Sequence, residues 1–198
     1  MANTGQDESK EHNRLGIALQ ARGRNVEAAQ EYRKAIQVNS GCASCHNNLA
    51  VVLKELDKLE EAEREARLAL RLKPGRADYL FNLGIILQQE NKLELAEAEL
   101  REAAGKQALD PEIRYRLSQV LMLLARPTDA EQEIKICIML RQNEAKYHKL
   151  LGDSLLQQGR HDEALLEYRK VLEITPNPPD VGDLRNKIDY LRQIIKVH

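Results

Sequence analysis

The chain has 198 residues, of which 31% are charged, yet its formal net charge at neutral pH is only −1. This balance argues against nucleic acid or an acidic membrane as the main partner. Aromatic residues make up 4% of the chain, with one Phe and no Trp, and runs of alternating β-branched residues are missing. Because the strong helix formers Ala, Leu, Glu, Lys and Arg dominate, we expect an all-α protein.

The N-terminal segment, residues 1–8, is polar, and we expect it to be disordered. It lacks the apolar core of a secretory signal, and no apolar stretch in the chain approaches the roughly 20 residues that span a bilayer. We therefore expect no membrane insertion and a cytoplasmic location, or a periplasmic one if a leader has been removed. The three cysteines (Cys42, Cys45 and Cys137) do not form a disulfide framework, so we expect free thiols in a reducing compartment.

A 34-residue period starts at residue 9 and continues without insertion to residue 178. It predicts five helix–turn–helix repeats, at residues 9–42, 43–76, 77–110, 111–144 and 145–178. The first helix of each repeat carries a Leu and then a small residue, as in Leu15-Gly16 and Leu151-Gly152. Twelve residues after the small residue comes an Ala in every repeat: Ala28, Ala62, Ala96, Ala130 and Ala164. Since small residues let two helix backbones approach closely, each repeat is predicted to be a packed helix pair.

A tight turn must join the two helices of each repeat. At this position the chain offers Gly23, Asp57, Asn91 and Gly159, which tolerate left-handed backbone geometry. The fourth repeat instead has Ala125, so we expect its turn to be distorted.

The last segment, residues 179–198, has a different pattern. Its apolar residues recur at spacings of three and four and form one stripe: Val181, Leu184, Ile188, Leu191 and Ile195. We expect a helix that caps the last repeat, whose apolar side would otherwise face water. Ile194 and Val197 lie off the stripe and leave open either mild exposure or self-association through this helix.

These features resemble the tetratricopeptide repeat family, whose period, Leu-small pair, Ala positions and repeat-end Pro (here Pro74 and Pro176) recur over about 170 of the 198 residues. The aromatic position of the family is occupied by Tyr32 and Tyr168 in the first and fifth repeats. The resemblance implies an α-solenoid, wound as a right-handed superhelix, whose first helices line a concave groove. In such proteins the groove binds another protein, either as an extended peptide or as a helix.

The resemblance also indicates which side chains face the groove. We expect these to be Asn13, Arg14, Asn47, Asn48, Lys54, Phe81, Asn82, Tyr115, Arg116, Gln119 and Lys149.

Two pairs within this set repeat at the 34-residue period. Asn48 and Asn82 resemble two rungs of the asparagine ladder in the repeat arm of O-linked N-acetylglucosamine transferase, and stacked amides can grip a peptide backbone. The alternative is that they are ordinary solvated residues. Phe81 and Tyr115 are either exposed anchors for a partner or rings that pack between neighbouring first helices. Arg116 and Lys149 lie close by and would suit an acidic peptide.

The segment from Cys42 to His46 has the Cys-x-x-Cys-His spacing of a covalent c-type haem site. Against haem, His also occurs at the equivalent positions His12 and His148, and the motif falls at a junction between tightly packed repeats. We expect no cofactor and no metal, and we find no sequence motif of an enzyme. The leading hypothesis is a protein-binding scaffold or adaptor. The alternatives are a haem-carrying electron-transfer protein and a self-assembling structural scaffold.

Overall fold

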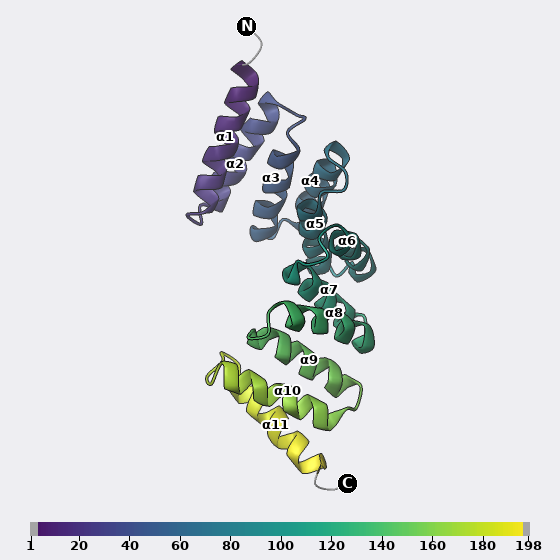
Figure 1. Cartoon of the computed structure of the whole chain (residues 1–198). Coiled ribbons are helices and arrows are strands. Elements are labelled where there is room, and N and C mark those ends of the chain that lie inside the picture. Colours follow the sequence, from purple (N-terminus) through teal and green to yellow (C-terminus); the bar gives the residue numbers. More distant parts are fainter. Residues whose placement is uncertain (1–3, 196–198) are drawn as a thin grey trace. The chain divides into compact units, whose positions relative to one another are not determined.

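The computed structural model describes residues 4–195, and its secondary structure over that range is helical (Figure 1). The N-terminal half, which extends to Gln107, contains α1 (Thr4–Gln20), α2 (Asn25–Val38), α3 (Ala43–Glu55), α4 (Leu59–Leu72), α5 (Ala77–Gln89) and α6 (Leu93–Lys106). The C-terminal half, from Ala108, contains α7 (Pro111–Leu123), α8 (Pro127–Leu140), α9 (Ala145–Gln157), α10 (His161–Ile174) and α11 (Val181–Ile195).

Helices α3, α5, α7 and α9 begin at residues 43, 77, 111 and 145, which are the first residues of the predicted second to fifth repeats. Of the segment 1–8 that was expected to be disordered, residues 4–8 belong to helix α1, and residues 1–3 lie outside the described residues. Polarity alone did not distinguish an exposed helical turn from a disordered tail. Ser9 fastens this end of α1, since its hydroxyl donates a 2.8 Å hydrogen bond to the carbonyl oxygen of Ala35 in α2.

Each pair of helices within a repeat packs through the predicted small residues. All five Ala residues at the second-helix position are fully buried. In repeat 1, a methyl group placed on Gly16 would lie 2.5 Å from the ring of Tyr32, and in repeat 5 one on Gly152 would lie 2.6 Å from Tyr168. The missing side chain of the first helix therefore makes room for the ring of the second.

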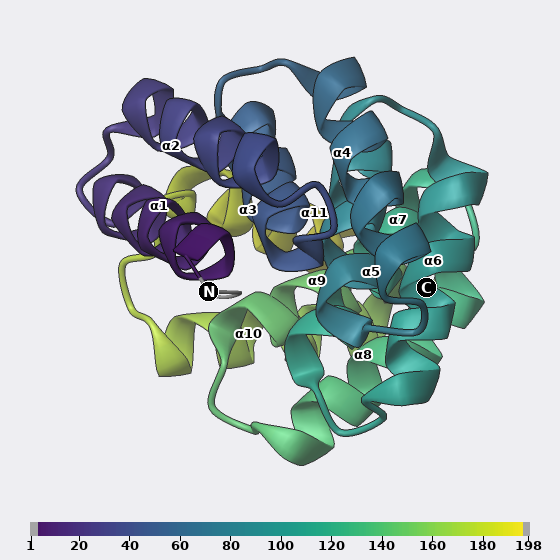
Figure 2. The ribbon, with the colours of Figure 1, turned by 90° about the horizontal axis from the view of Figure 1, so that it is seen from above.

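Within the N-terminal half, successive pairs stack so that α1 contacts α3 and α3 contacts α5. Figure 2 shows the second helices α4 and α6 outside the first helices α3 and α5 of the same half. The first helices of this half therefore present one continuous row, α1, α3 and α5.

The turn of the fourth repeat is not distorted, contrary to the expectation. Ala125 adopts a φ of 54°, close to the 58° of Asp57 and Asn91 in the matching turns. The hydrogen bonds are also equivalent, since the amide of Arg126 donates to Leu121 at 2.9 Å just as that of Arg24 donates to Leu19 at 3.0 Å. Packing of the helix pair has imposed a left-handed conformation on a residue with a Cβ, at a cost of about 1–2 kcal/mol.

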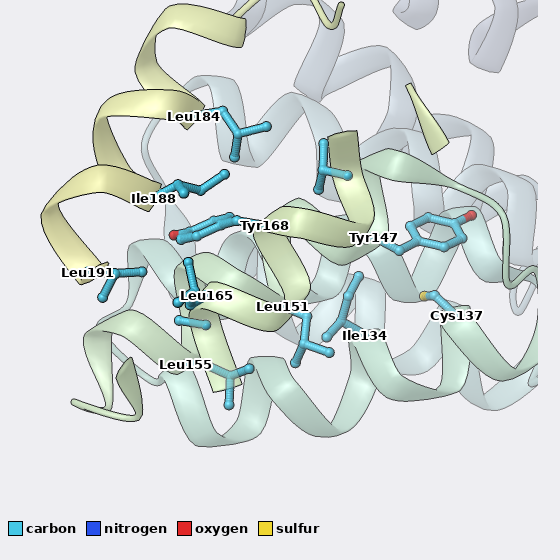
Figure 3. Close-up of a cluster of buried hydrophobic side chains, with 12 residues drawn as sticks. Ile134, Cys137, Tyr147, Leu151, Leu155, Leu165, Tyr168, Leu184, Ile188 and Leu191 are labelled. Carbon is cyan, nitrogen blue, oxygen red and sulfur yellow. The ribbon is translucent and has the colours of Figure 1, made fainter. Parts of the chain in front are cut away.

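Helix α11 covers the end of the C-terminal half as predicted. Its residues Leu184, Ile188 and Leu191 are buried and join the core that contains Tyr168 and Leu165 of α10 (Figure 3). Ile195 packs against the same core, and Ile194 and Ile195 both line a separate cavity of about 320 Å³ beside the turn at Gly159. Val197 lies outside the described residues.

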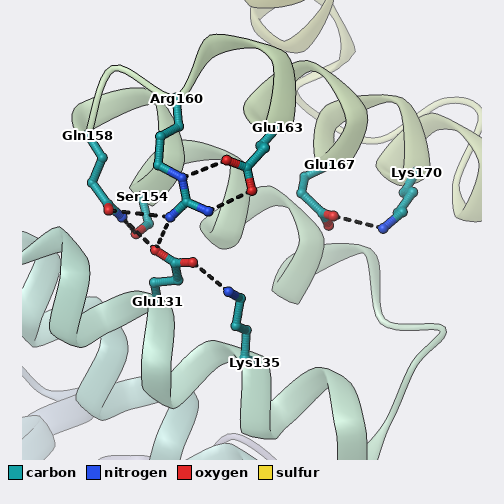
Figure 4. A network of polar contacts seen from close by, with 8 residues as sticks. All are labelled: Glu131, Lys135, Ser154, Gln158, Arg160, Glu163, Glu167 and Lys170. Carbon is teal, nitrogen blue, oxygen red and sulfur yellow. Dashed lines mark hydrogen bonds and ion pairs between the residues drawn. The ribbon is translucent and has the colours of Figure 1, made fainter.

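Ion pairs connect consecutive repeats on the side of the second helices. In the C-terminal half, Glu131 of α8 accepts hydrogen bonds from Arg160 at 2.6 Å, from Lys135 at 2.6 Å and from Gln158 at 2.9 Å (Figure 4). Burial alone would raise the pKa of Glu131, but these three donors outweigh it and lower the pKa to about 2. In the N-terminal half, Glu63 occupies the same register and pairs with Lys92 at 2.5 Å.

Candidate functional site

Asparagine pairs connect neighbouring first helices in the N-terminal half. Asn48 of α3 donates its amide to Asn13 Oδ1 of α1 at 3.1 Å, and Asn82 of α5 donates to Asn47 Oδ1 of α3 at 2.9 Å. The predicted pair Asn48 and Asn82 therefore do not bond to each other, and each has a partner in the preceding repeat. Asn47 is only 7% exposed, so its main role is to link helices, whereas Asn13, Asn48 and Asn82 are half-buried.

The other predicted residues of this half have simpler surroundings. Phe81 is half-buried on α5. Lys54 forms a 2.8 Å ion pair with Glu55 of its own helix. Arg14 is exposed and has no hydrogen bond or ion pair within residues 4–195.

A row of apolar residues accompanies the asparagines and was missed among the predicted site residues. Ile17 of α1, Val51 of α3 and Ile85 of α5 occur at the same position of three repeats; Ile17 is 49% exposed, and the other two are half-buried. They follow the asparagine positions by three or four residues and so share a helix face with them. We call this set the first-helix face: Asn13, Ile17, Asn48, Val51, Phe81, Asn82 and Ile85. Its sequence signal is an apolar residue that repeats every 34 positions outside the Leu-small core positions.

Rings take the place of amides in the C-terminal half. Tyr115 of α7 lies against Tyr147 of α9, with 5.4 Å between ring centroids, and Lys146 Nζ lies 4.8 Å from the Tyr115 centroid. Burial raises the pKa of Tyr115. The ring thus packs between neighbouring first helices, which was the alternative to an exposed anchor.

The remaining predicted residues of this half are held by neighbours. The Arg116 guanidinium donates to Gln119 Oε1 at 3.3 Å and lies 3.4 Å from Glu112. Lys149 pairs with Asp180, just before α11, and therefore ties the capping helix to α9. An acidic peptide would have to displace these partners.

The expectation of free thiols at Cys42 and Cys45 is wrong, because a disulfide joins them at the start of α3. Cys42 is the N-cap of that helix, and its sulfur accepts the backbone N–H of Cys45 at 3.3 Å. Two cysteines three residues apart at the start of a helix lie close enough to form a disulfide. Their spacing in the sequence is the same whether the pair is oxidised or reduced, so it could not predict the bond. The inference of a reducing compartment loses this support. Cys137 is a free, buried thiol, and burial raises its pKa to about 12.

The arrangement at His46 does not support the haem interpretation. The disulfide occupies both sulfurs that haem attachment would need. The imidazole is only 6% exposed, with Nδ1 2.6 Å from Glu65 Oε2 and Nε2 3.2 Å from the carbonyl oxygen of Ser40. The hydrogen bond with Glu65 raises the pKa of His46, and the bond with Ser40 adds to this effect against the opposing effect of burial. Neither ring nitrogen is directed at an open ligand position.

The histidine row of the sequence belongs to a repeated pair of side chains. The fourth residue of repeats 1, 2 and 5 is a His whose Nδ1 lies 2.6 Å from a Glu carboxylate 19 residues later: His12–Glu31, His46–Glu65 and His148–Glu167. In repeat 4, Arg114 and Glu133 make the same pair at 2.6 Å. A basic side chain of the first helix therefore pairs with a carboxylate of the second helix, and this contact stabilises the packing of the two helices.

Over residues 4–195 no group of three or more His, Cys, Asp or Glu side chains could hold a metal ion. Within the same range, none of the helices has the length and apolar character that crossing a bilayer requires.

Comparison with known protein families matches this chain over most of its length. A model described as tetratricopeptide repeat matches residues 13–77 and again 81–135, and another of the same description matches residues 145–178. No curated protein sequence matches the chain.

Solved structures with the same arrangement of helices are numerous. YrrB, described as a tetratricopeptide repeat protein with an unusual peptide-binding site, has a TM-score of 0.75 and 19% identity, covering 89% of this chain and 95% of its own. The pilF protein of Pseudomonas aeruginosa has a TM-score of 0.77 and 22% identity, covering 98% of this chain and 93% of its own. A MamA structure has a TM-score of 0.74 and 24% identity, covering 84% of this chain and 95% of its own. At these identities the likeness concerns the fold.

Proposed function

We propose that this chain, which belongs to the tetratricopeptide repeat family, is a scaffold protein. It holds an extended segment of another protein on its first-helix face. The fold is one that binds proteins, and the N-terminal half offers the more suitable surface. The proposal makes the chain a binding protein without a catalytic role.

The observation that supports this proposal most is the combination of amides and apolar side chains on α1, α3 and α5. A primary amide has two N–H donors and a carbonyl acceptor. The bond between Asn48 and Asn13 uses one donor of Asn48 and the carbonyl of Asn13, so the carbonyl of Asn48 and the amino group of Asn13 stay outside it. These atoms can pair with a peptide backbone, while Ile17, Val51 and Ile85 provide apolar contacts for alternate side chains.

An affinity capture from cell extract tests the proposal. The triple variant Ile17→Asp, Asn48→Ala, Asn82→Ala removes the apolar and amide groups of the first-helix face. The control Gln30→Ala, Gln37→Ala, Glu94→Ala changes three exposed residues of second helices in the same half. We expect a specific partner that is captured by wild type and by the control, and that is depleted about tenfold or more with the first-helix variant.

If the first-helix variant captures the partner as well as the control does, the partner binds somewhere other than on the first helices. Because each lost hydrogen bond of an amide costs only about 1 kcal/mol, thermal unfolding of both variants shows whether they remain folded at the capture temperature.

The cytoplasmic location expected from the sequence stays a prediction. The disulfide between Cys42 and Cys45 favours an oxidising compartment instead.

A further inference from the structure

Repeat 3 is the one repeat in which the base of the recurring pair is replaced by an apolar residue. Its fourth residue is Leu80, which is 3% exposed, where the other four repeats have His or Arg. The matching carboxylate, Glu99 of α6, is still there. It makes no hydrogen bond or ion pair with any of residues 4–195, whereas its equivalents all lie 2.6 Å from a base.

Glu99 lines a cavity of about 690 Å³ in the N-terminal half, between α4, the loop at Pro74 and the helices of repeat 3. The cavity has an apolar part, formed by four leucines: Leu68, Leu70, Leu80 and Leu83. It shares no residue with the first-helix face. Its volume is in the range of natural ligand pockets, which combine apolar walls with a few polar groups.

The charges around the cavity compensate that of Glu99 only in part. Arg67 is the basic side chain that acts on Glu99 electrostatically, but its Nε donates to Glu63 at 2.7 Å. Burial raises the pKa of Glu99. A half-buried carboxylate in leucine surroundings gains most from a donor that is itself positively charged.

We propose that this cavity is a second binding site, for a partner segment that inserts one basic side chain, flanked by apolar residues, against Glu99. The partner's basic side chain would pair with the Glu99 carboxylate, as the His or Arg of the first helix pairs with the equivalent Glu in repeats 1, 2, 4 and 5. The exposed guanidiniums of Arg64 and Arg71, which also line the cavity and pair with no other described residue, favour an acidic residue near that base. The occupant is thus an apolar peptide segment with a basic side chain and an acidic neighbour.

The test uses the full-length protein and a defined probe, N-acetyl-Leu-Arg-Leu-Glu amide. Its counterpart has citrulline in place of arginine, which keeps the shape and removes the charge. Binding is followed by the NMR signals of the leucine methyl groups and of the Glu99 carboxyl carbon during a titration. We expect saturable shifts of Leu80 and Glu99 with the arginine peptide, and at least about tenfold weaker binding of the citrulline peptide.

Three variants make the test specific to the cavity. Glu99→Gln removes the charge, and Leu80→His rebuilds the internal base of repeats 1, 2 and 5; both should weaken the arginine peptide about tenfold or more. Glu60→Gln removes an exposed carboxylate of α4 outside the cavity and should leave the affinity unchanged. If Leu80→His fails to fold, Glu99→Gln carries the test alone.

Several results would overturn the proposal. These are equal binding of the arginine and citrulline peptides, undiminished binding by Glu99→Gln, and the absence of saturable shifts up to about 10 mM peptide. A loss of affinity in Glu60→Gln equal to that in Glu99→Gln would also overturn it, since the effect would then be one of net charge.

Discussion

The two halves of the chain connect their neighbouring first helices by different chemistry. In the N-terminal half the links are amide pairs, Asn13 with Asn48 and Asn47 with Asn82. In the C-terminal half the link is a pair of rings, Tyr115 with Tyr147, which continues into the apolar core. An amide link keeps donors and acceptors at the surface, whereas a ring link removes surface from water. Tyr115 is the fifth residue of its repeat, as are Asn13 and Asn47, but Tyr147 is the third residue of its repeat, whereas Asn48 and Asn82 are the sixth. Neighbouring first helices of one fold can therefore be linked through a polar face in one half and a rigid apolar contact in the other.

The ring link should contribute far more to stability than the amide link. Tyr147 is fully buried, so Tyr147→Ala should lower the free energy of unfolding by about 3–5 kcal/mol. Asn47→Ala removes one hydrogen bond and should cost about 1 kcal/mol. Urea unfolding followed by circular dichroism measures both. Equal losses would break the comparison, because the two links would then contribute alike.

The halves should respond alike to acid, because each has an ion-paired carboxylate between repeats, buried at Glu131 and half-buried at Glu63. The pKa of Glu131 in the folded protein is about 2, below its ordinary value of 4.5, and that of Glu63 is also about 2. For a lowered pKa the stabilisation is complete above the ordinary value and is lost as pH falls from about 5 to about 2. Replacing Glu131 by Gln should cost about 1–2 kcal/mol at pH 7. Urea unfolding between pH 7 and pH 2.5 should show a flatter profile for Glu131→Gln, and an unchanged slope would contradict the assignment.

Two buried tyrosines of the C-terminal half should respond in opposite directions to the loss of their hydroxyl. The hydroxyl of Tyr147 is buried without a hydrogen-bond partner among the residues described, so Tyr147→Phe should be neutral or raise stability by up to about 1 kcal/mol. Tyr168 donates to Asp153 at 2.7 Å, and Tyr168→Phe should cost about 1 kcal/mol. Thermal unfolding of the two variants checks the sign of each change. Destabilisation by Tyr147→Phe would mean that its hydroxyl has a partner in solution.

The turns of repeats 1 and 4 differ in strain. Ala125 has a φ of 54° where repeat 1 has Gly23, so Ala125→Gly should stabilise the protein by about 0.5–1 kcal/mol. The converse change, Gly23→Ala, should destabilise it by a similar amount. Ala98→Gly, at an exposed site inside α6, is the control and should cost up to about 1 kcal/mol. If Ala125→Gly lowers the melting temperature as the control does, the left-handed conformation of Ala125 costs nothing.

The sequence predicted the fold well because helix pairing depends on small residues at fixed intervals. Ala62 and Ala96 are fully buried, and Leu53 and Leu87 are at most 1% exposed, as the 34-residue register requires. The turn at Ala125 was misjudged because local preference is weak beside the packing of two complete helices. The disulfide was missed because Cys42 and Cys45 have the same spacing whether oxidised or reduced.

The candidate site was predicted in outline, since register identifies the helix face but not what each side chain contacts. Asn48 and Asn82 were placed on the correct helices, yet their bonds to Asn13 and Asn47 depend on how neighbouring helices are staggered. The pairing of Lys149 with Asp180 depends on the position of α11, which no repeat pattern specifies. The missing basic partner of Glu99 could be recognised only from the His–Glu and Arg–Glu contacts that the other repeats make in the structure.

Site-specific photocrosslinking in cells shows whether a partner lies on the first-helix face. A photoreactive benzoylphenylalanine replaces Ile17 or Ile85 on the first-helix face, or Gln30 or Ala98 on second helices of the same half, and crosslinked partners are identified by mass spectrometry. We predict that one partner is crosslinked from positions 17 and 85 and not from positions 30 and 98. Crosslinking from positions 30 and 98 without any from 17 and 85 would contradict it.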